Sequence, residues 1–216
     1  MSFVICCATS EYGIIASDGR MVDAETEEVI RDDYTKVVRV NDRLVVGFAG
    51  DESVCELSLA EMSKKYRDAD NSIDRATVFL KSFLQMLSLN GAPLCETTFY
   101  VLGSGETGMV RFNTVTSIGN VRVIEHVPEN KDDIRIAYCG CEVSKSVYGS
   151  ILSSIQDFGF VSGLTLEIRK VADTHPTVGK QVYIQSIRHE RIHPHKERSD
   201  TSCPWIENSK AKMKSQ

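Results

Sequence analysis

The chain has 216 residues, of which 42% are hydrophobic and 25% charged, and its formal net charge is −5. This length predicts one domain whose core needs no metal or disulfide framework. The negative charge argues against nucleic acid or an anionic membrane as partner and leaves proteins, peptides and small molecules. No apolar run reaches the roughly 18 to 20 residues of a membrane span, and no basic flank opens the chain, so we expect a cytoplasmic protein with reduced cysteines and no cofactor.

The first fifty residues predict strands joined by hairpins. Residues 3–8 and 12–17 are apolar runs separated by a short polar turn, and a polar stretch covers 21–33. Two further apolar runs, "KVVRV" and "RLVVGFAG", are joined by Asn41 and Asp42, which favour a tight turn. Four strands therefore precede the first helix.

Two helices are predicted next. Asp51 can cap a helix whose apolar residues recur at helical spacing up to Tyr66. In the second, residues 73–87 carry one apolar stripe, Ser72 offers an N-cap and Gly91 ends it.

The second half of the chain repeats this order. Residues 97–138 contain four strand-like runs, which indicate a second sheet, and helices are predicted over 142–157 and 162–173 before a last strand, "KQVYIQSI". Strands and helices in separate blocks predict an α+β fold with antiparallel sheets. We expect a folded domain over 1–190 and a polar, mobile tail over 191–216.

Two motifs have simpler interpretations than they first suggest. "GSGETG" at 103–108 matches a dinucleotide-binding fingerprint, but a strand-like run follows where that fingerprint requires a helix, so we interpret it as a turn. Cys139 and Cys141 are spaced more tightly than structural zinc ligands, and the histidines and Cys203 of the tail lack a framework, so we expect no metal site.

The start of the chain suggests nucleophilic chemistry. Removal of Met1 would make Ser2 the N-terminal residue, and a free α-amine with a pKa of about 7.7 to 8.0 can act as the base for its own hydroxyl. Such a site needs a cation, a carboxylate that holds it and a backbone donor for the oxyanion. Lys36 at the start of the third strand, Asp18 at the end of the second and Gly47 in the fourth are the candidates.

The segments "FVICCATSEYGIIASDGR" and "YTKVVRVNDRLVVGFAGD" resemble proteasome β-type subunits and bacterial proteasome-like peptidases, within the N-terminal nucleophile hydrolases. The resemblance covers roughly residues 2–187, and its specific part is the first fifty. Ser2, Asp18, Arg20, Lys36 and Gly47 fall on the family's motif positions.

The later part of the family's site matches less closely. Where the family has a serine before a glycine, this chain has Cys139 before Gly140. Where it has Asp-x-x-Ser-Gly-Gly, this chain has Asp173, with Thr177 at a displaced spacing and one glycine. Cys139 and Asp173 are therefore the candidates for the groups around the amine.

The resemblance implies a four-layer αββα sandwich and an endopeptidase in which Ser2 attacks the peptide carbonyl. It also implies a homo-oligomeric ring that encloses the sites, and it leaves open whether an ATPase partner exists. Two alternatives remain at this point: a hydrolase of small amides with the same fold, and a catalytically silent ring subunit. The silent subunit would follow if Met1 is retained, and for Asp18 and Lys36 taken alone the alternative is an ordinary structural ion pair.

Overall fold

The computed structural model describes residues 2–23, 25–66, 73–90, 96–105, 108–118, 120–140 and 146–188. Within these ranges the chain forms strands and helices in the following order: β1 (Phe3–Ala8), β2 (Tyr12–Asp18), β3 (Met21–Val22), β4 (Val29–Arg31), β5 (Val37–Asn41), β6 (Leu44–Ala49), α1 (Glu52–Tyr66), α2 (Ile73–Leu89), β7 (Thr98–Ser104), β8 (Val110–Thr116), β9 (Arg122–His126), β10 (Arg135–Gly140), α3 (Ser146–Thr174) and β11 (Val182–Arg188).

A four-stranded antiparallel sheet contains both ends of the described chain. Its order is β10-β1-β2-β11. β1 is central and buried on both faces, which explains why "FVICCA" is apolar without alternation. Val4 pairs with Ser17 on one side and with Cys139 on the other, so these three residues share one face of the sheet.

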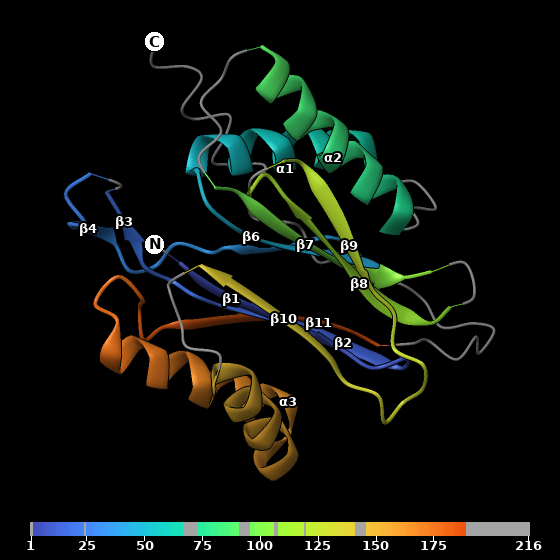
Figure 1. The fold of residues 1–216 in the computed structure, drawn as a ribbon, viewed down its shortest axis with the longest axis vertical. Coiled ribbons are helices and arrows are strands. Elements are labelled where there is room, and N and C mark those ends of the chain that lie inside the picture. The colour runs from blue at the N-terminus through green and yellow to red at the C-terminus, as the bar shows by residue number, and fades with distance from the viewer. Residues whose placement is uncertain are drawn as a thin grey trace.

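A five-stranded antiparallel sheet, with order β5-β6-β7-β8-β9, forms the other half. α1 and α2 pack on its outer face through a cluster that includes Met62, Leu80 and Phe99. α3 covers the outer face of the four-stranded sheet through Ile151, Leu164 and their neighbours. Figure 1 shows these helices on opposite sides of the molecule with the two sheets between them.

The two sheets face each other across a third apolar cluster. β1 contributes Val4 and Cys6, and the opposing sheet contributes Val45, Tyr100 and Phe112. At one border the Arg39 guanidinium of β5 donates to the Ser186 carbonyl of β11 over 2.6 Å, which ties the sheet edges together. The structure is therefore a mixed α/β fold built from antiparallel sheets.

Most predicted elements are confirmed, including the α1 cap, where the Val54 N–H donates to the Asp51 carboxylate over 3.1 Å. The assignment of residues 97–138 to a separate second sheet was wrong. β7, β8 and β9 extend the β5–β6 hairpin, while β10 joins β1. Hairpin turns specify which strands are consecutive neighbours, but the pairing of β1 with β10 is long-range and leaves no local signature.

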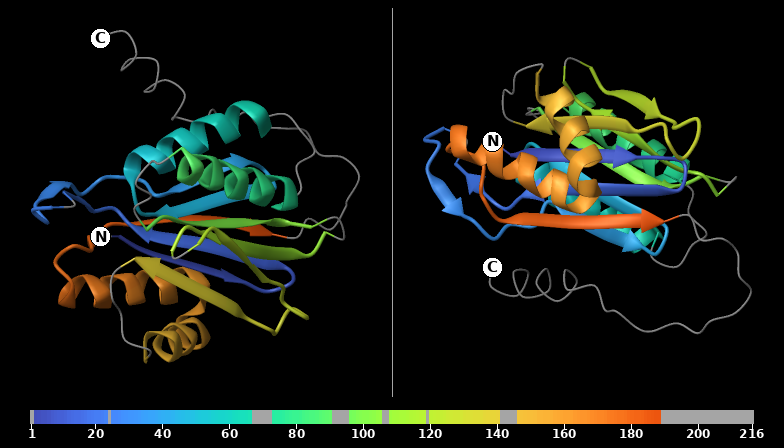
Figure 2. Two further views of the ribbon diagram at one scale, coloured as in Figure 1. Left: turned by 45° about the horizontal axis from the view of Figure 1, so that its top comes forward. Right: turned by 90° about the horizontal axis from the view of Figure 1, so that it is seen from below.

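One local feature goes beyond the sequence-based expectation, and a second agrees with it. The polar stretch 21–33 forms a small two-stranded ribbon, β3 and β4, that projects beyond the sheets (Figures 1 and 2). The two helices predicted in the second half are confirmed as the two parts of α3, which are separated at Gly159 by a non-helical backbone whose φ of 77° suits a residue without a side chain.

Ser72, Gly91 and the tail, on which further predictions depend, lie outside the described residues. Among the described helices, none combines the length and apolarity needed to cross a bilayer.

Candidate active site

The Asp18 carboxylate is the centre of a buried polar network at the end of β2. Its side chain is 0% exposed. Oδ1 accepts hydrogen bonds from the Phe3 N–H over 2.9 Å and from Lys36 Nζ over 2.7 Å. Oδ2 accepts from the Arg20 N–H over 2.8 Å and from the Gly179 N–H over 2.9 Å. Four donors thus stabilise one carboxylate in the protein interior.

Lys36 precedes β5 and reaches across to this carboxylate. Its side chain is 2% exposed, and Nζ also donates to the Arg20 carbonyl oxygen. Burial lowers the pKa of Lys36 below its usual range, and the interactions with Asp18 and Cys139 oppose that effect. Burial and the fixed Asp18 counter-ion thus act on the pKa of this ammonium in opposite directions.

The backbone places Ser2 beside this pair. The amide that links Ser2 to Phe3 donates to the same oxygen that Lys36 Nζ contacts. On the other side, Gly140 lies so close that a Cβ atom there would overlap the Ser2 carbonyl oxygen, and its φ is +119°. Ser2 is therefore held between the Asp18 network and the end of β10. Met1 lies outside the described residues.

Cys139 lies in the same region. It is partly exposed, pairs with Val4 and faces the inter-sheet space. Its thiol hydrogen-bonds with the hydroxyl of Tyr100, a buried β7 residue whose pKa is raised by burial and by Cys139. Cys139 and Asp18 thus approach Lys36 from two different strands. Tyr100 was not a sequence-based candidate, because nothing local distinguishes it from other aromatic core residues.

Gly47 lies within β6, paired with Val37 and Tyr100. A Cβ atom there would lie 2.6 Å from Ile15 Cγ2, so close packing of the two sheets accounts for the glycine. The Phe48 N–H donates to the Lys36 carbonyl over 3.0 Å. Because successive N–H groups alternate along a strand, the Gly47 N–H faces β7, away from Lys36.

Gly50 is a second glycine near the end of this strand. It follows the end of β6, is exposed, and has a φ of +127°. It lies two residues after Phe48, whose N–H donates to the Lys36 carbonyl. The signal that could have identified Gly50 is its place at the strand-to-helix junction, where backbone N–H groups are not used by a ladder.

The structure does not place Asp173 in the polar network around Asp18 and Lys36. Asp173 is near the end of α3, its side chain is 62% exposed, and it pairs with Lys180 over 2.6 Å. The segment that joins α3 to β11 contacts Asp18 instead through the backbone N–H of Gly179. Thr177, the other displaced family position, is buried in this connection.

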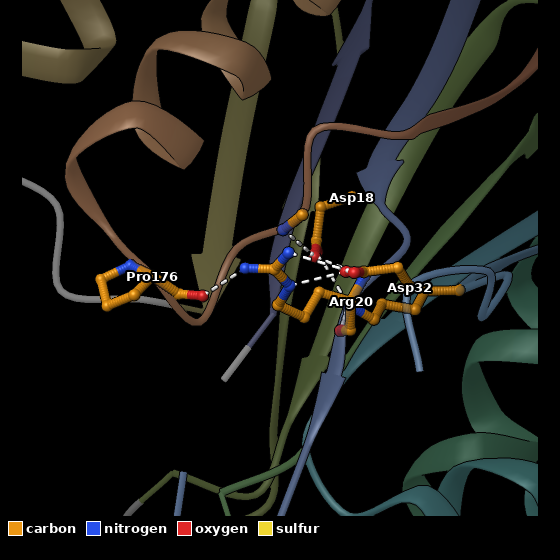
Figure 3. A network of polar contacts seen from close by, with 6 residues as sticks. Asp18, Arg20, Asp32 and Pro176 are labelled. Atoms are coloured by element: carbon orange, nitrogen blue, oxygen red, sulfur yellow. Dashed lines mark hydrogen bonds and ion pairs between the residues drawn. The ribbon is translucent and has the colours of Figure 1, made fainter. Parts of the chain in front are cut away.

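Arg20 has a structural role that the sequence pattern did not specify. Figure 3 shows its guanidinium between Asp32 and Pro176. Nε donates to Asp32 over 2.6 Å and Nη1 donates to the Pro176 carbonyl over 2.6 Å. The side chain thus connects the β4 end of the ribbon to the loop that carries Gly179, while the Arg20 backbone contacts Asp18 and Lys36.

In the part of the chain that the structure describes, no group of three or more His, Cys, Asp or Glu side chains is placed to hold a metal ion. Cys141, Cys203 and the tail histidines lie outside it. What the arrangement offers is a buried cation, a thiol and a backbone N–H group around the second residue of the chain. This set suits stabilisation of negative charge on an oxygen or sulfur nucleophile.

Comparison with known proteins supports the same fold. No family model and no curated protein matches the chain. Among solved structures, eukaryotic HslV from Trypanosoma brucei is similar, with a TM-score of 0.63 and 18% sequence identity over 87% of this chain and 99% of that chain. This likeness shows that the chain has the fold of HslV.

Proposed function

We propose that the protein is a proteasome-like peptidase that uses Ser2, exposed by removal of Met1, as an N-terminal nucleophile. In this proposal the order α1 and α2, five-stranded sheet, four-stranded sheet, α3 is the four-layer αββα sandwich of that superfamily. The likeness to HslV supports the fold, and the site supports the chemistry.

The observation that carries the proposal is the shared oxygen of Asp18. One carboxylate oxygen accepts from both the Ser2–Phe3 amide and the Lys36 ammonium. A structural ion pair alone gives no reason for a buried lysine to be fixed beside the second residue of the chain. Burying this pair is costly, because each ion loses several kcal/mol of hydration, and proteins tolerate such costs most often at functional sites.

The proposed reaction follows from these positions. The Ser2 α-amine accepts the proton of the Ser2 hydroxyl, and Oγ attacks the carbonyl carbon of a peptide bond. Lys36 stabilises the charge that develops on Oγ, and Asp18 keeps Lys36 in place. The oxyanion binds a backbone N–H, for which we propose Gly50, just beyond the end of β6, because the Gly47 N–H faces β7. The leaving amine takes the proton, and water then hydrolyses the ester on Ser2.

The remaining sequence candidates take different places in the proposal. Cys139 precedes Gly140, whose backbone packs against Ser2, whereas Asp173 pairs with Lys180 at the surface and takes no part in the proposed reaction. We further propose a homo-oligomeric ring as the working form, on the likeness to HslV. The substrates are then peptides or unfolded chains that reach the enclosed sites.

Peptide hydrolysis by matched variants tests the proposal. Ser2→Ala and Lys36→Ala should each abolish turnover of unstructured peptides, and Lys36→Arg should lose most of it, because a planar guanidinium does not fit the place of a compact ammonium. Asp173→Asn serves as the control and should keep most of the activity. Circular dichroism and light scattering should show that fold and assembly are unchanged.

Two results would contradict the proposal. Full turnover by Ser2→Ala would place the nucleophile elsewhere. If the protein hydrolysed small amides but not peptides, Ser2 would remain the nucleophile, but the chain would be an amidohydrolase and not a peptidase.

A further inference from the structure

A surface pocket lies between the β4 end of the ribbon and the segment that joins α3 to β11. Its volume is about 270 Å³, and its walls are formed by Arg20, Asp32, Ala172, Val178, Lys180 and Gln181. Sites for drug-sized ligands usually have volumes of about 300 to 1,000 Å³. The pocket therefore suits a smaller molecule or the end of a peptide chain.

The Arg20 guanidinium at this pocket has donors to spare. A guanidinium carries five N–H groups. Nε and Nη2 donate to the Asp32 carboxylate, and Nη1 donates to the Pro176 carbonyl (Figure 3). One N–H on Nη1 and one on Nη2 thus have no partner among the described residues. The side chain is 24% exposed and lines the pocket, so a ligand there can reach these N–H groups.

Lys180 is the second cation of the pocket. Its Nζ pairs with Asp173 over 2.6 Å, and its side chain is 71% exposed. An ammonium has three donors, so two remain for a ligand. Ala172 and Val178 give the pocket apolar walls. Two cations beside apolar walls match a carboxylate that carries a short apolar group.

The acidic residues near the pocket favour a ligand with a single negative charge. Asp32 lines the pocket, and Asp173 is the counter-ion of Lys180. A phosphate group carries close to two negative charges near pH 7, so these carboxylates repel it more strongly than they repel a carboxylate. The planar fork of a guanidinium also matches the two oxygens of a carboxylate.

The walls of the pocket belong to the two segments that hold Asp18. The Arg20 N–H donates to Asp18 Oδ2 over 2.8 Å, and the Gly179 N–H, next to Lys180 in the chain, donates to the same oxygen over 2.9 Å. A Cβ atom on Gly179 would lie 2.9 Å from Arg20 Cβ, so the two segments are in close contact. A ligand that binds both Arg20 and Lys180 would therefore hold the two donors of Asp18 together.

We propose that this pocket binds the carboxylate group of a small ligand, to which Arg20 and Lys180 donate hydrogen bonds. The carboxylate has two sources with the same chemistry, a free short-chain acid and the C-terminus of a short peptide. In a consequence that rests on the proposed function, a bound carboxylate accelerates peptide hydrolysis, because it fixes the backbone donors that orient Asp18 and, through it, Lys36.

The primary test measures binding and does not depend on enzyme activity. The full chain is titrated at constant ionic strength with butyrate and with N-acetyl-alanyl-alanine, and each acid is compared with its neutral amide. An acid at ten times its Kd should raise the melting temperature by about 3 to 6 °C, whereas its amide should change it by less than about 1 °C. Binding of butyrate alone would identify free acids as the ligands, and binding of the peptide alone would identify C-termini.

Variants of the pocket should change the affinity in opposite directions. Lys180→Met should weaken binding of the acid about two- to fivefold, and Asp173→Asn should strengthen it by a similar factor, because it removes the carboxylate that competes for Lys180. Arg20→Gln should weaken binding at least about tenfold, because it removes the charged donors, and circular dichroism checks that this variant folds.

The matched control is Lys64→Met. Lys64 lies on α1, is 72% exposed and pairs with Glu61 over 2.6 Å, so it resembles Lys180 in exposure and pairing. This variant should leave the affinity for the acid unchanged. Equal affinity for acid and amide, no binding of either acid, or equal effects of Lys180→Met and Lys64→Met would overturn the proposal.

A second arm tests the consequence for hydrolysis. Butyrate should raise kcat for an unstructured peptide, and Lys180→Met should need a higher butyrate concentration for the same rise. Unchanged or reduced turnover at saturating butyrate would overturn this consequence. Carboxylate binding by a protein that hydrolyses no peptide would support the pocket as a binding site and count against the proposed function.

Discussion

Replacing Asp18 by asparagine is the most informative perturbation of the buried network. An asparagine side chain keeps the volume of aspartate but presents one oxygen and one NH₂ group. Asp18 accepts two hydrogen bonds on each oxygen. The NH₂ group must therefore face two donors, and the Lys36 ammonium loses its counter-ion.

The expected cost follows from these contacts. Removing one partner of a buried ion pair costs about 3 to 5 kcal/mol. The donors left unsatisfied add to this, and neutralisation of Lys36 reduces it, so we expect a loss of about 4 kcal/mol. For a domain of this size such a loss lowers the melting temperature by about 8 to 16 °C.

Urea denaturation of the full chain measures this loss. The matched control is Asp32→Asn, which removes a carboxylate that pairs with Arg20 but is 54% exposed, and this variant should lose no more than about 1 kcal/mol. Adding Lys36→Met to Asp18→Asn should recover part of the loss, because it removes the uncompensated charge. If Asp18→Asn costs no more than Asp32→Asn, or if the double variant is less stable than Asp18→Asn alone, the account of this network is refuted.

Three further predictions concern stability. Gly140→Ala should destabilise the protein by several kcal/mol or displace Ser2, because the added methyl group would overlap the Ser2 carbonyl and the φ of residue 140 is +119°. A melting temperature within about 2 °C of the parent would contradict this close contact. Burial raises the pKa of Glu167, but hydrogen bonds from Lys170 and Ser154 outweigh it, so the pKa lies below the usual 4.5. The stabilisation that ionised Glu167 provides is thus complete above about pH 4.5 and is lost as the pH falls through the lower pKa of the folded state. The difference in unfolding free energy between the parent and Glu167→Gln, measured by urea denaturation, should therefore become smaller in acid. A larger difference in acid would refute this linkage. Truncation after residue 190 should leave the melting temperature within a few degrees, whereas a large loss would show that the tail packs on the domain or on a second copy.

The pairing of Asp18 with Lys36 was predictable from the sequence because both residues stand at strand ends in the family's register. Most helices and strands were predictable because their periodicity and caps are local signals. The pairing of Cys139 with Val4, two residues after Ser2, could be expected only through the resemblance, since β10 and β1 are far apart in the chain.

Other parts of the site could not be predicted from local signals. Gly47 and Gly50 are both plausible oxyanion donors in the sequence, and only the alternation of N–H groups along β6 separates them. Asp173 matched a family position, yet its carboxylate pairs with Lys180 at the surface. Gly179 and Tyr100 contribute through long-range contacts, which a single sequence does not encode as a pattern.

Identification of the acylated residue tests the central claim most directly. The purified protein is incubated with a peptidyl β-lactone, which acylates a nucleophilic hydroxyl, and the adduct is located by intact mass and peptide mapping. The proposed function predicts one adduct per active chain, on Ser2 of a chain that lacks Met1, and no adduct in Lys36→Ala. Peptide hydrolysis by a chain that retains Met1, with the adduct on any residue other than Ser2, would contradict it.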